Sequence, residues 1–162
     1  VEASRRDAGV AVELFKSDWD LRRASGLNVP PYVPDALVRV RTPTGVHGLV
    51  FEADAATETT RFVRDRKVAV LSDLAATRSP VWGLRPWKPV LVTTTPERLR
   101  RLAVICAEVP GATAWLATTE RALRQEGPLG PVARTLAEIA AFKPTDPFAG
   151  CRSLLDGSPA VT

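Results

Sequence analysis

A short apolar run at residues 89–93 is the feature that most constrains how this chain can fold. Five uncharged residues are too few for a buried helix but suit a central β-strand that is covered on both faces. Before the run, the apolar positions of residues 57–76 recur at the spacing of an amphipathic helix. After it, Pro96 marks the first turn of a helix that we expect to reach about Glu108. A strand between two helices predicts an α/β fold.

A β-hairpin is expected before this unit. Residues 36–41 alternate in polarity, residues 42–45 contain Pro43 and Gly45 and predict a turn, and residues 46–53 return as a second strand. The other expected elements are a strand at 10–15, a helix from Ser17-Asp18 to Gly26, a strand at 113–118, and helices at 119–125 and 132–141. This order predicts a mixed β-sheet flanked by helices.

Composition narrows the functional classes. The 162 residues suit one domain, and the absence of methionine, including at residue 1, predicts a fragment of a longer protein. No stretch approaches the roughly 20 apolar residues that cross a bilayer, and Cys106 and Cys151 lack metal-site or redox spacing, so we expect a cytoplasmic protein with reduced thiols. A net charge of +4 permits nucleic-acid binding without requiring it. No phosphate-binding loop, dinucleotide fingerprint or zinc-ligand pattern supports nucleotide hydrolysis or redox chemistry.

Three carboxylates stand at the open end of the predicted hairpin. Asp35 precedes its first strand, and Glu52 and Asp54 end its second strand on one face. Carboxylates that close together repel one another, and their hard oxygens favour Mg²⁺ or Mn²⁺, so the sequence indicates a metal site. The alternative is that these are solvated residues of a hairpin end with no function.

Residues 33–37 (VPDAL) and 51–59 (FEADAATET), with Lys67 on the next helix, resemble the replication-relaxation family. The resemblance extends over about residues 14–123. It implies a restriction-endonuclease-like fold of the PD-(D/E)xK type, in which a proline-aspartate and a (D/E)-x-K on neighbouring strands bind a metal and cleave phosphodiesters. It would make Asp35 and Glu52 metal ligands. Members of the family commonly carry a winged-helix segment before this domain, and nothing in this chain resembles one.

The chain departs from that pattern where the strand lysine is expected. Two residues after Glu52 it has Asp54, so we expect Lys67 to supply the cation from the helix, with Arg64 one turn earlier. The alternative is that Lys67 and Arg64 are solvated or bind phosphate without chemistry. The residues expected to contact DNA lie on two helices and are Arg61, Arg64, Lys67, Arg98 and Arg101.

Two functions remain open from the sequence. The first is a metal-dependent DNA nuclease or nickase of plasmids or mobile elements, with Asp35, Glu52, Asp54 and Lys67 as catalytic residues and Mg²⁺ or Mn²⁺ as cofactor. The second is a non-catalytic DNA-binding or protein-interaction module on a degenerate nuclease fold. In either case DNA is the expected partner, together with plasmid replication or mobilisation proteins and a second copy in a homodimer, whereas no membrane is expected.

Overall fold

The computed structural model describes residues 9–26, 32–127, 132–141, 151 and 154–155. Six strands form one sheet in the order of the chain. They are β1 (Ala11–Ser17), β2 (Ala36–Thr42), β3 (Gly45–Asp54), β4 (Lys88–Thr93), β5 (Leu116–Thr119) and β6 (Arg134–Thr135). Strands β1 to β3 are antiparallel, β3 to β5 are parallel, and β6 runs antiparallel to β5. The predicted α/β class with a mixed sheet is therefore confirmed.

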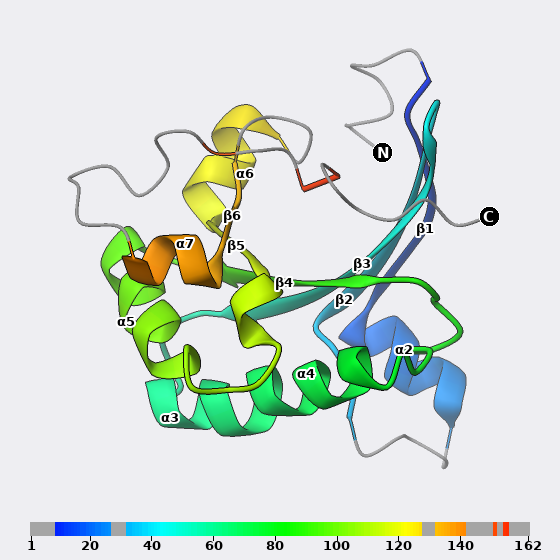
Figure 1. Ribbon diagram of the computed structural model, residues 1–162. Helices are drawn as coiled ribbons and strands as arrows, with labels where there is room; N and C mark the ends of the chain where they lie inside the picture. The colour runs from blue at the N-terminus through cyan, green and yellow to red at the C-terminus, as the bar shows by residue number, and fades with distance from the viewer. Residues whose placement is uncertain (1–8, 27–31, 128–131, 142–150, 152–153, 156–162) are drawn as a thin grey trace.

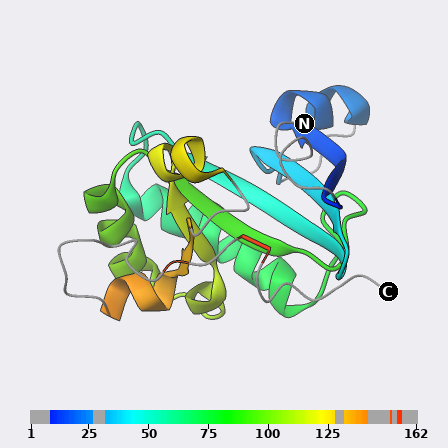
Figure 2. The same ribbon diagram turned by 90° about the horizontal axis from the view of Figure 1, so that it is seen from above.

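Helices cover both faces of the sheet. They are α2 (Asp18–Ser25), α3 (Thr60–Phe62), the π-helix η1 (Val63–Val68), α4 (Ala69–Ala76), α5 (Pro96–Cys106), the 3-10 helix η2 (Ala112–Ala114), α6 (Glu120–Glu126) and α7 (Leu136–Ala141). Figure 1 shows α3 and α4 below the sheet and α6 above it, and Figure 2 shows α6, in yellow, on the side of the sheet that faces the viewer. The larger core, with Val50, Leu91 and Leu99, lies on the α4 and α5 side, and a smaller core with Leu49 and Val90 lies on the α6 side.

Side-chain caps fix where the main helices begin. Ser17 caps α2 in a reciprocal pair with Asp20, Thr95 caps α5 with Pro96 in its first turn, and Thr119 caps α6. Each cap hydroxyl accepts a backbone N–H that has no partner within the helix. The predicted starts of these three helices are confirmed.

The tight turn of the β2–β3 hairpin sets the register of its far end. Thr42 pairs with Gly45, and the ladder continues without a shift to Ala36 opposite Phe51. Asp35 therefore lies next to Glu52 at the open end. Strand alternation places Asp35, Glu52 and Asp54 toward the face that α4 and α5 cover.

Several predicted boundaries were wrong. The strand expected at 113–118 is Leu116–Thr119, because η2 occupies the preceding residues. The helix expected at 132–141 begins at Leu136, because Arg134–Thr135 pairs with β5 as β6. The helix expected at 57–76 begins at Thr60 and contains the π-helical turn η1.

A loop between α4 and β4 packs tightly onto β3. A Cβ atom added at Gly48 would lie 2.5 Å from the Pro86 carbonyl oxygen and 2.9 Å from Leu84 Cγ, so only glycine fits there. Trp82 and Trp87 pack against the larger core, and Trp87 Nε1 donates to the Ser79 carbonyl at 2.9 Å. These tryptophans anchor the loop to the protein.

Candidate functional site

The open end of the hairpin brings Asp35 and Glu52 together. The Asp35 side chain accepts a hydrogen bond from the Ala53 backbone N–H at 2.7 Å, and the Asp35 carbonyl accepts one from Asp18 N at 2.9 Å. The first turn of α2 and the end of β3 thus hold Asp35 from both sides. The juxtaposition expected from the hairpin pattern is present in the structure.

Lys67 joins these carboxylates from the helix. Its Nζ donates to Asp35 Oδ2 at 3.3 Å and to the Ala53 carbonyl oxygen at 3.0 Å. The same atom lies 3.5 Å from Glu52 Oε2 and 3.4 Å from Glu58 Oε2. Four oxygens thus surround one ammonium group, whose side chain is 16% exposed. We call Asp35, Glu52, Glu58 and Lys67, with the Ala53 carbonyl, the Lys67 cluster.

Lys67 projects from the π-helical turn η1. A π-turn changes the angular phase of the residues that follow it, and such turns occur often at functional sites. The widened turn lies directly opposite the ends of β2 and β3, because Lys67 contacts both Asp35 and Ala53. The face toward which Lys67 points is thus set by a local departure from regular α-helix.

Glu52 is the most deeply buried acid of the cluster, at 1% exposed. The Tyr32 hydroxyl donates to its Oε1, while Oε2 faces Lys67. Burial raises the pKa of Glu52 to about 7 and the charge of Asp35 adds to the rise, whereas the Tyr32 hydrogen bond and Lys67 oppose it. The pKa of Glu52 thus lies near neutral pH because its carboxyl group is buried.

The two partners of Glu52 respond to the same surroundings. Burial raises the pKa of the Tyr32 hydroxyl, and the charges of Glu52 and Asp35 raise it further, so Tyr32 remains a hydrogen-bond donor. Burial opposes the charge on Lys67, but Glu52, Asp35 and Glu58 together outweigh it and raise the pKa of its ammonium. Lys67 is therefore a cation when the carboxylates are ionised.

Asp54 does not join the Lys67 cluster. Arg98, on α5, binds it through Nε at 2.6 Å and Nη2 at 3.0 Å, and Nη2 also donates to the Glu58 carbonyl at 2.6 Å. Asp54 Oδ1 accepts a further bond from Ala56 N at 3.1 Å. This fully buried carboxylate holds α5 and the segment after β3 together. Glu58 occupies the place in the cluster that the sequence pattern assigned to Asp54.

The other basic residues expected to contact DNA have different surroundings. Arg61 and Arg64 both pair with Asp65, at 3.5 and 2.6 Å. Arg101 is exposed on α5. Lys67 and Arg98 are engaged in the internal ion pairs described above, so the structure does not gather the five side chains into one basic surface.

The donor chemistry of the cluster suits a hard divalent cation. Its three carboxylates and one backbone carbonyl offer oxygens, which Mg²⁺ and Mn²⁺ prefer. The oxygens lie 3.0–3.5 Å from Lys67 Nζ, whereas Mg²⁺ binds oxygen at about 2.1 Å. A bound ion would require Lys67 Nζ to move aside. Within the described ranges, no three His, Cys, Asp or Glu side chains are arranged to hold a metal ion.

Sequence reasoning missed Tyr32 as a site residue and gave Glu58 no role of its own. Tyr32 is the only tyrosine of the chain and lies three residues before Asp35, which was the available signal. Glu58 lies in the segment that follows β3, and only its contact with Lys67 reveals its place. Cys106 and Cys151, predicted to be reduced, are free thiols in the structure.

Comparison with known proteins found no matching family model, no matching curated protein and no matching solved structure. Among the helices of the described residues, none is long and apolar enough to span a membrane.

Proposed function

We propose that this chain is a metal-dependent DNA endonuclease or nickase of restriction-endonuclease-like fold, with the Lys67 cluster as its active site. One observation carries the proposal: Lys67 reaches Asp35, Glu52 and the Ala53 carbonyl from the helix, although the strand position of the PD-(D/E)xK pattern holds Asp54. Two acids and a lysine of that pattern therefore meet without the usual sequence spacing.

The sheet topology gives further support. Asp35 lies directly before β2 and Glu52 lies on the antiparallel strand β3, and the strand after the intervening helix is parallel to β3. This arrangement is consistent with the neighbouring acidic strands of the PD-(D/E)xK superfamily. The replication-relaxation resemblance and the association with plasmid or mobile-element DNA belong to the same proposal.

In this proposal Asp35, Glu52 and the Ala53 carbonyl would hold Mg²⁺ or Mn²⁺ once Lys67 Nζ moves aside. The bound ion would neutralise charge developing on the phosphate and favour ionisation of water. A bound cation would lower the pKa of Glu52 from about 7, so Glu52 would act as an ionised ligand and the attacking water would lose its proton to bulk solvent, while Tyr32 would fix the orientation of the Glu52 carboxyl group. Lys67 carries the positive charge that orients the phosphate. Water adds to phosphorus, the bond from phosphorus to the sugar oxygen breaks, and bulk solvent protonates the departing sugar oxygen, so a single strand break results.

A second candidate is a non-catalytic DNA-binding module, and the contacts of Lys67 also favour it. The ammonium already fills the space between the carboxylates, as a structural ion-pair network would. Such a module would bind DNA with a steep dependence on salt and no dependence on metal.

Incubation with supercoiled plasmid in Mg²⁺ or Mn²⁺ separates the two candidates. A nuclease nicks the plasmid, and chelator, Asp35→Asn or Glu52→Gln abolishes nicking. Glu126→Gln, which changes an exposed acid at the end of α6, is the matched control and retains it. Gel shifts that weaken as salt rises, with no nicking in either metal, would refute the nuclease and support the non-catalytic DNA-binding module.

A further inference from the structure

A second charged surface lies toward the turn end of the β2–β3 hairpin. Two adjoining hollows, with volumes of about 480 and 490 Å³, share Arg85 as a lining residue. The first is also lined by Arg39 and Arg41, and the second by Arg78. We call Arg39, Arg41, Arg78 and Arg85 the arginine row. Arg39, Arg41 and Arg78 were not expected to bind DNA from the sequence.

The arginine row carries an excess of positive charge. All four residues are exposed, and in the part of the chain that the structure describes Glu13 is the only acid lining either hollow. Glu13 is shared, because it lies 3.3 Å from Arg39 Nε and 2.5 Å from Arg41 Nε. The two hollows therefore carry four guanidinium groups and one carboxylate, which pairs only with Arg39 and Arg41, so the surface attracts anions.

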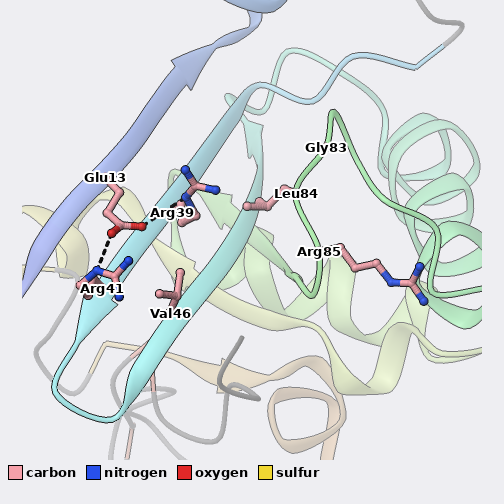
Figure 3. A pocket seen from close by; sticks show the side chains of 7 residues that line it. All are labelled: Glu13, Arg39, Arg41, Val46, Gly83, Leu84 and Arg85. Atoms are coloured by element: carbon pink, nitrogen blue, oxygen red, sulfur yellow. Dashed lines mark hydrogen bonds and ion pairs between the residues drawn. The ribbon is translucent and has the colours of Figure 1, made fainter. Parts of the chain in front are cut away.

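The guanidinium groups are spread out and do not converge on one point. Figure 3 shows Arg39 and Arg41 on the strand beside Glu13, while the Arg85 side chain extends away from them on the far side of Leu84. Arg39 and Arg41 are two residues apart on β2, which separates their Cα atoms by about 7 Å. A single small anion would touch only part of this row. A chain of repeated anionic groups could contact all of it.

The chemistry of arginine favours phosphate as the repeated group. A guanidinium group binds phosphate through two parallel hydrogen bonds, and its charge does not titrate in the physiological range. The hollows also offer apolar walls, with Leu84 and Val46 in the first and Trp87 in the second. These walls can lie against the sugars of a nucleic-acid strand.

We propose that the arginine row binds the phosphate backbone of DNA outside the segment that reaches the Lys67 cluster. This inference rests on the proposed function for the identity of the polymer. Arg39 lies four residues along β2 from Asp35, a separation of about 13 Å, so contacts at the row are remote from any phosphate at the cluster. The row supplies affinity, and the Lys67 cluster supplies the chemistry.

Binding of a short fluorescein-labelled DNA duplex, measured by anisotropy in chelator over a series of salt concentrations, tests the inference without any cleavage. The double variant Arg78→Gln/Arg85→Gln should weaken binding about tenfold and reduce the slope of log affinity against log salt by about 2, because two phosphate contacts are lost. Glu13→Gln should have the opposite effect and tighten binding about threefold, because it releases Arg39 and Arg41 from their shared acid.

The matched control is Arg121→Gln/Arg124→Gln, which removes two exposed arginines from α6 and should bind as the wild type does. Three results would each overturn the inference: no DNA binding by the wild type, unchanged binding in both the Arg78/Arg85 and Glu13 variants, or equally tight binding of poly-glutamate in competition. If the wild type does not nick plasmid but it and the three variants bind DNA as described, the proposed nuclease is refuted and the inference about the arginine row is supported.

Discussion

Replacing Glu52 with glutamine is expected to change how the stability of the protein depends on pH. Glu52 is 1% exposed, and its pKa in the folded protein is about 7, compared with 4.5 for a solvated glutamic acid. The folded state therefore binds the proton more tightly than the unfolded chain does. The contribution of protonated Glu52 to the free energy of unfolding is fully present below pH 4.5 and is lost as the pH rises through 7. That difference in pKa corresponds to a loss of about 3 kcal/mol in the free energy of unfolding.

Glu52→Gln removes this titration while keeping an oxygen that can accept from Tyr32. Urea unfolding at a series of pH values, in chelator, gives the free energies of unfolding of wild type and variant. The variant should gain about 3 kcal/mol relative to wild type between pH 4.5 and pH 8. Glu126→Gln, an exposed change, should show no such trend. If the free energies of unfolding of wild type and Glu52→Gln change with pH in parallel, Glu52 does not titrate near neutral pH and the reasoning is refuted.

Three further changes test the contacts around the site. Lys67→Met leaves the carboxylates of the cluster without their shared cation and should lower the free energy of unfolding, measured in urea, by about 2 kcal/mol at pH 8. The loss is modest because two of the carboxylates are partly solvated, and it should be smaller at pH 5, where the buried Glu52 is protonated. Arg98→Met leaves the buried Asp54 carboxylate unpaired and should cost about 3–5 kcal/mol in the same assay. Gly48→Ala forces a Cβ atom within 2.5 Å of the Pro86 carbonyl, so the loop must shift and a thermal melt should show a loss of about 1–3 kcal/mol.

Arg101→Met is the control for Arg98→Met, since both residues lie on α5 but Arg101 is exposed. Equal stabilities of these two variants would contradict the structural role given to the Asp54–Arg98 pair. A Lys67→Met protein equally stable relative to wild type at pH 5 and pH 8 would show that Lys67 does not compensate ionised carboxylates. An unchanged melting temperature for Gly48→Ala would mean that the loop does not pack against β3 as described.

The open end of the hairpin could be predicted because its geometry is local. A short turn between Thr42 and Gly45 and the two-residue period of a strand suffice to place Asp35 beside Glu52 and to put Asp54 on the same face. The two-residue alternation of a strand predicts the face on which a side chain lies, but it does not predict which residues contact that side chain. Arg98 comes from a helix 44 residues farther along the chain, and no local pattern links it to Asp54.

The position of Lys67 could be predicted only in outline. Helical periodicity placed it on an amphipathic helix, but the π-turn η1 changes the phase that decides its direction. The two-residue strand β6 was too short to produce an alternating pattern. The start of α7 could have been predicted, because Thr135 and Glu138 have the sequence spacing of a capping box. In the structure the Thr135 hydroxyl accepts from Glu138 N, and the Glu138 carboxylate accepts from Thr135 N.

The nicking rate of supercoiled plasmid at pH 8 in Mg²⁺, compared between wild type, Glu52→Gln and Lys67→Met, tests whether the Lys67 cluster is an active site. The wild type should nick the plasmid until chelator is added, and both variants should lose at least about 100-fold in rate, because one lacks a carboxylate that would hold the ion and the other lacks the cation that orients the phosphate. Nicking of equal rate in all three proteins, or none by the wild type in Mg²⁺ or Mn²⁺, would contradict an active site at the Lys67 cluster.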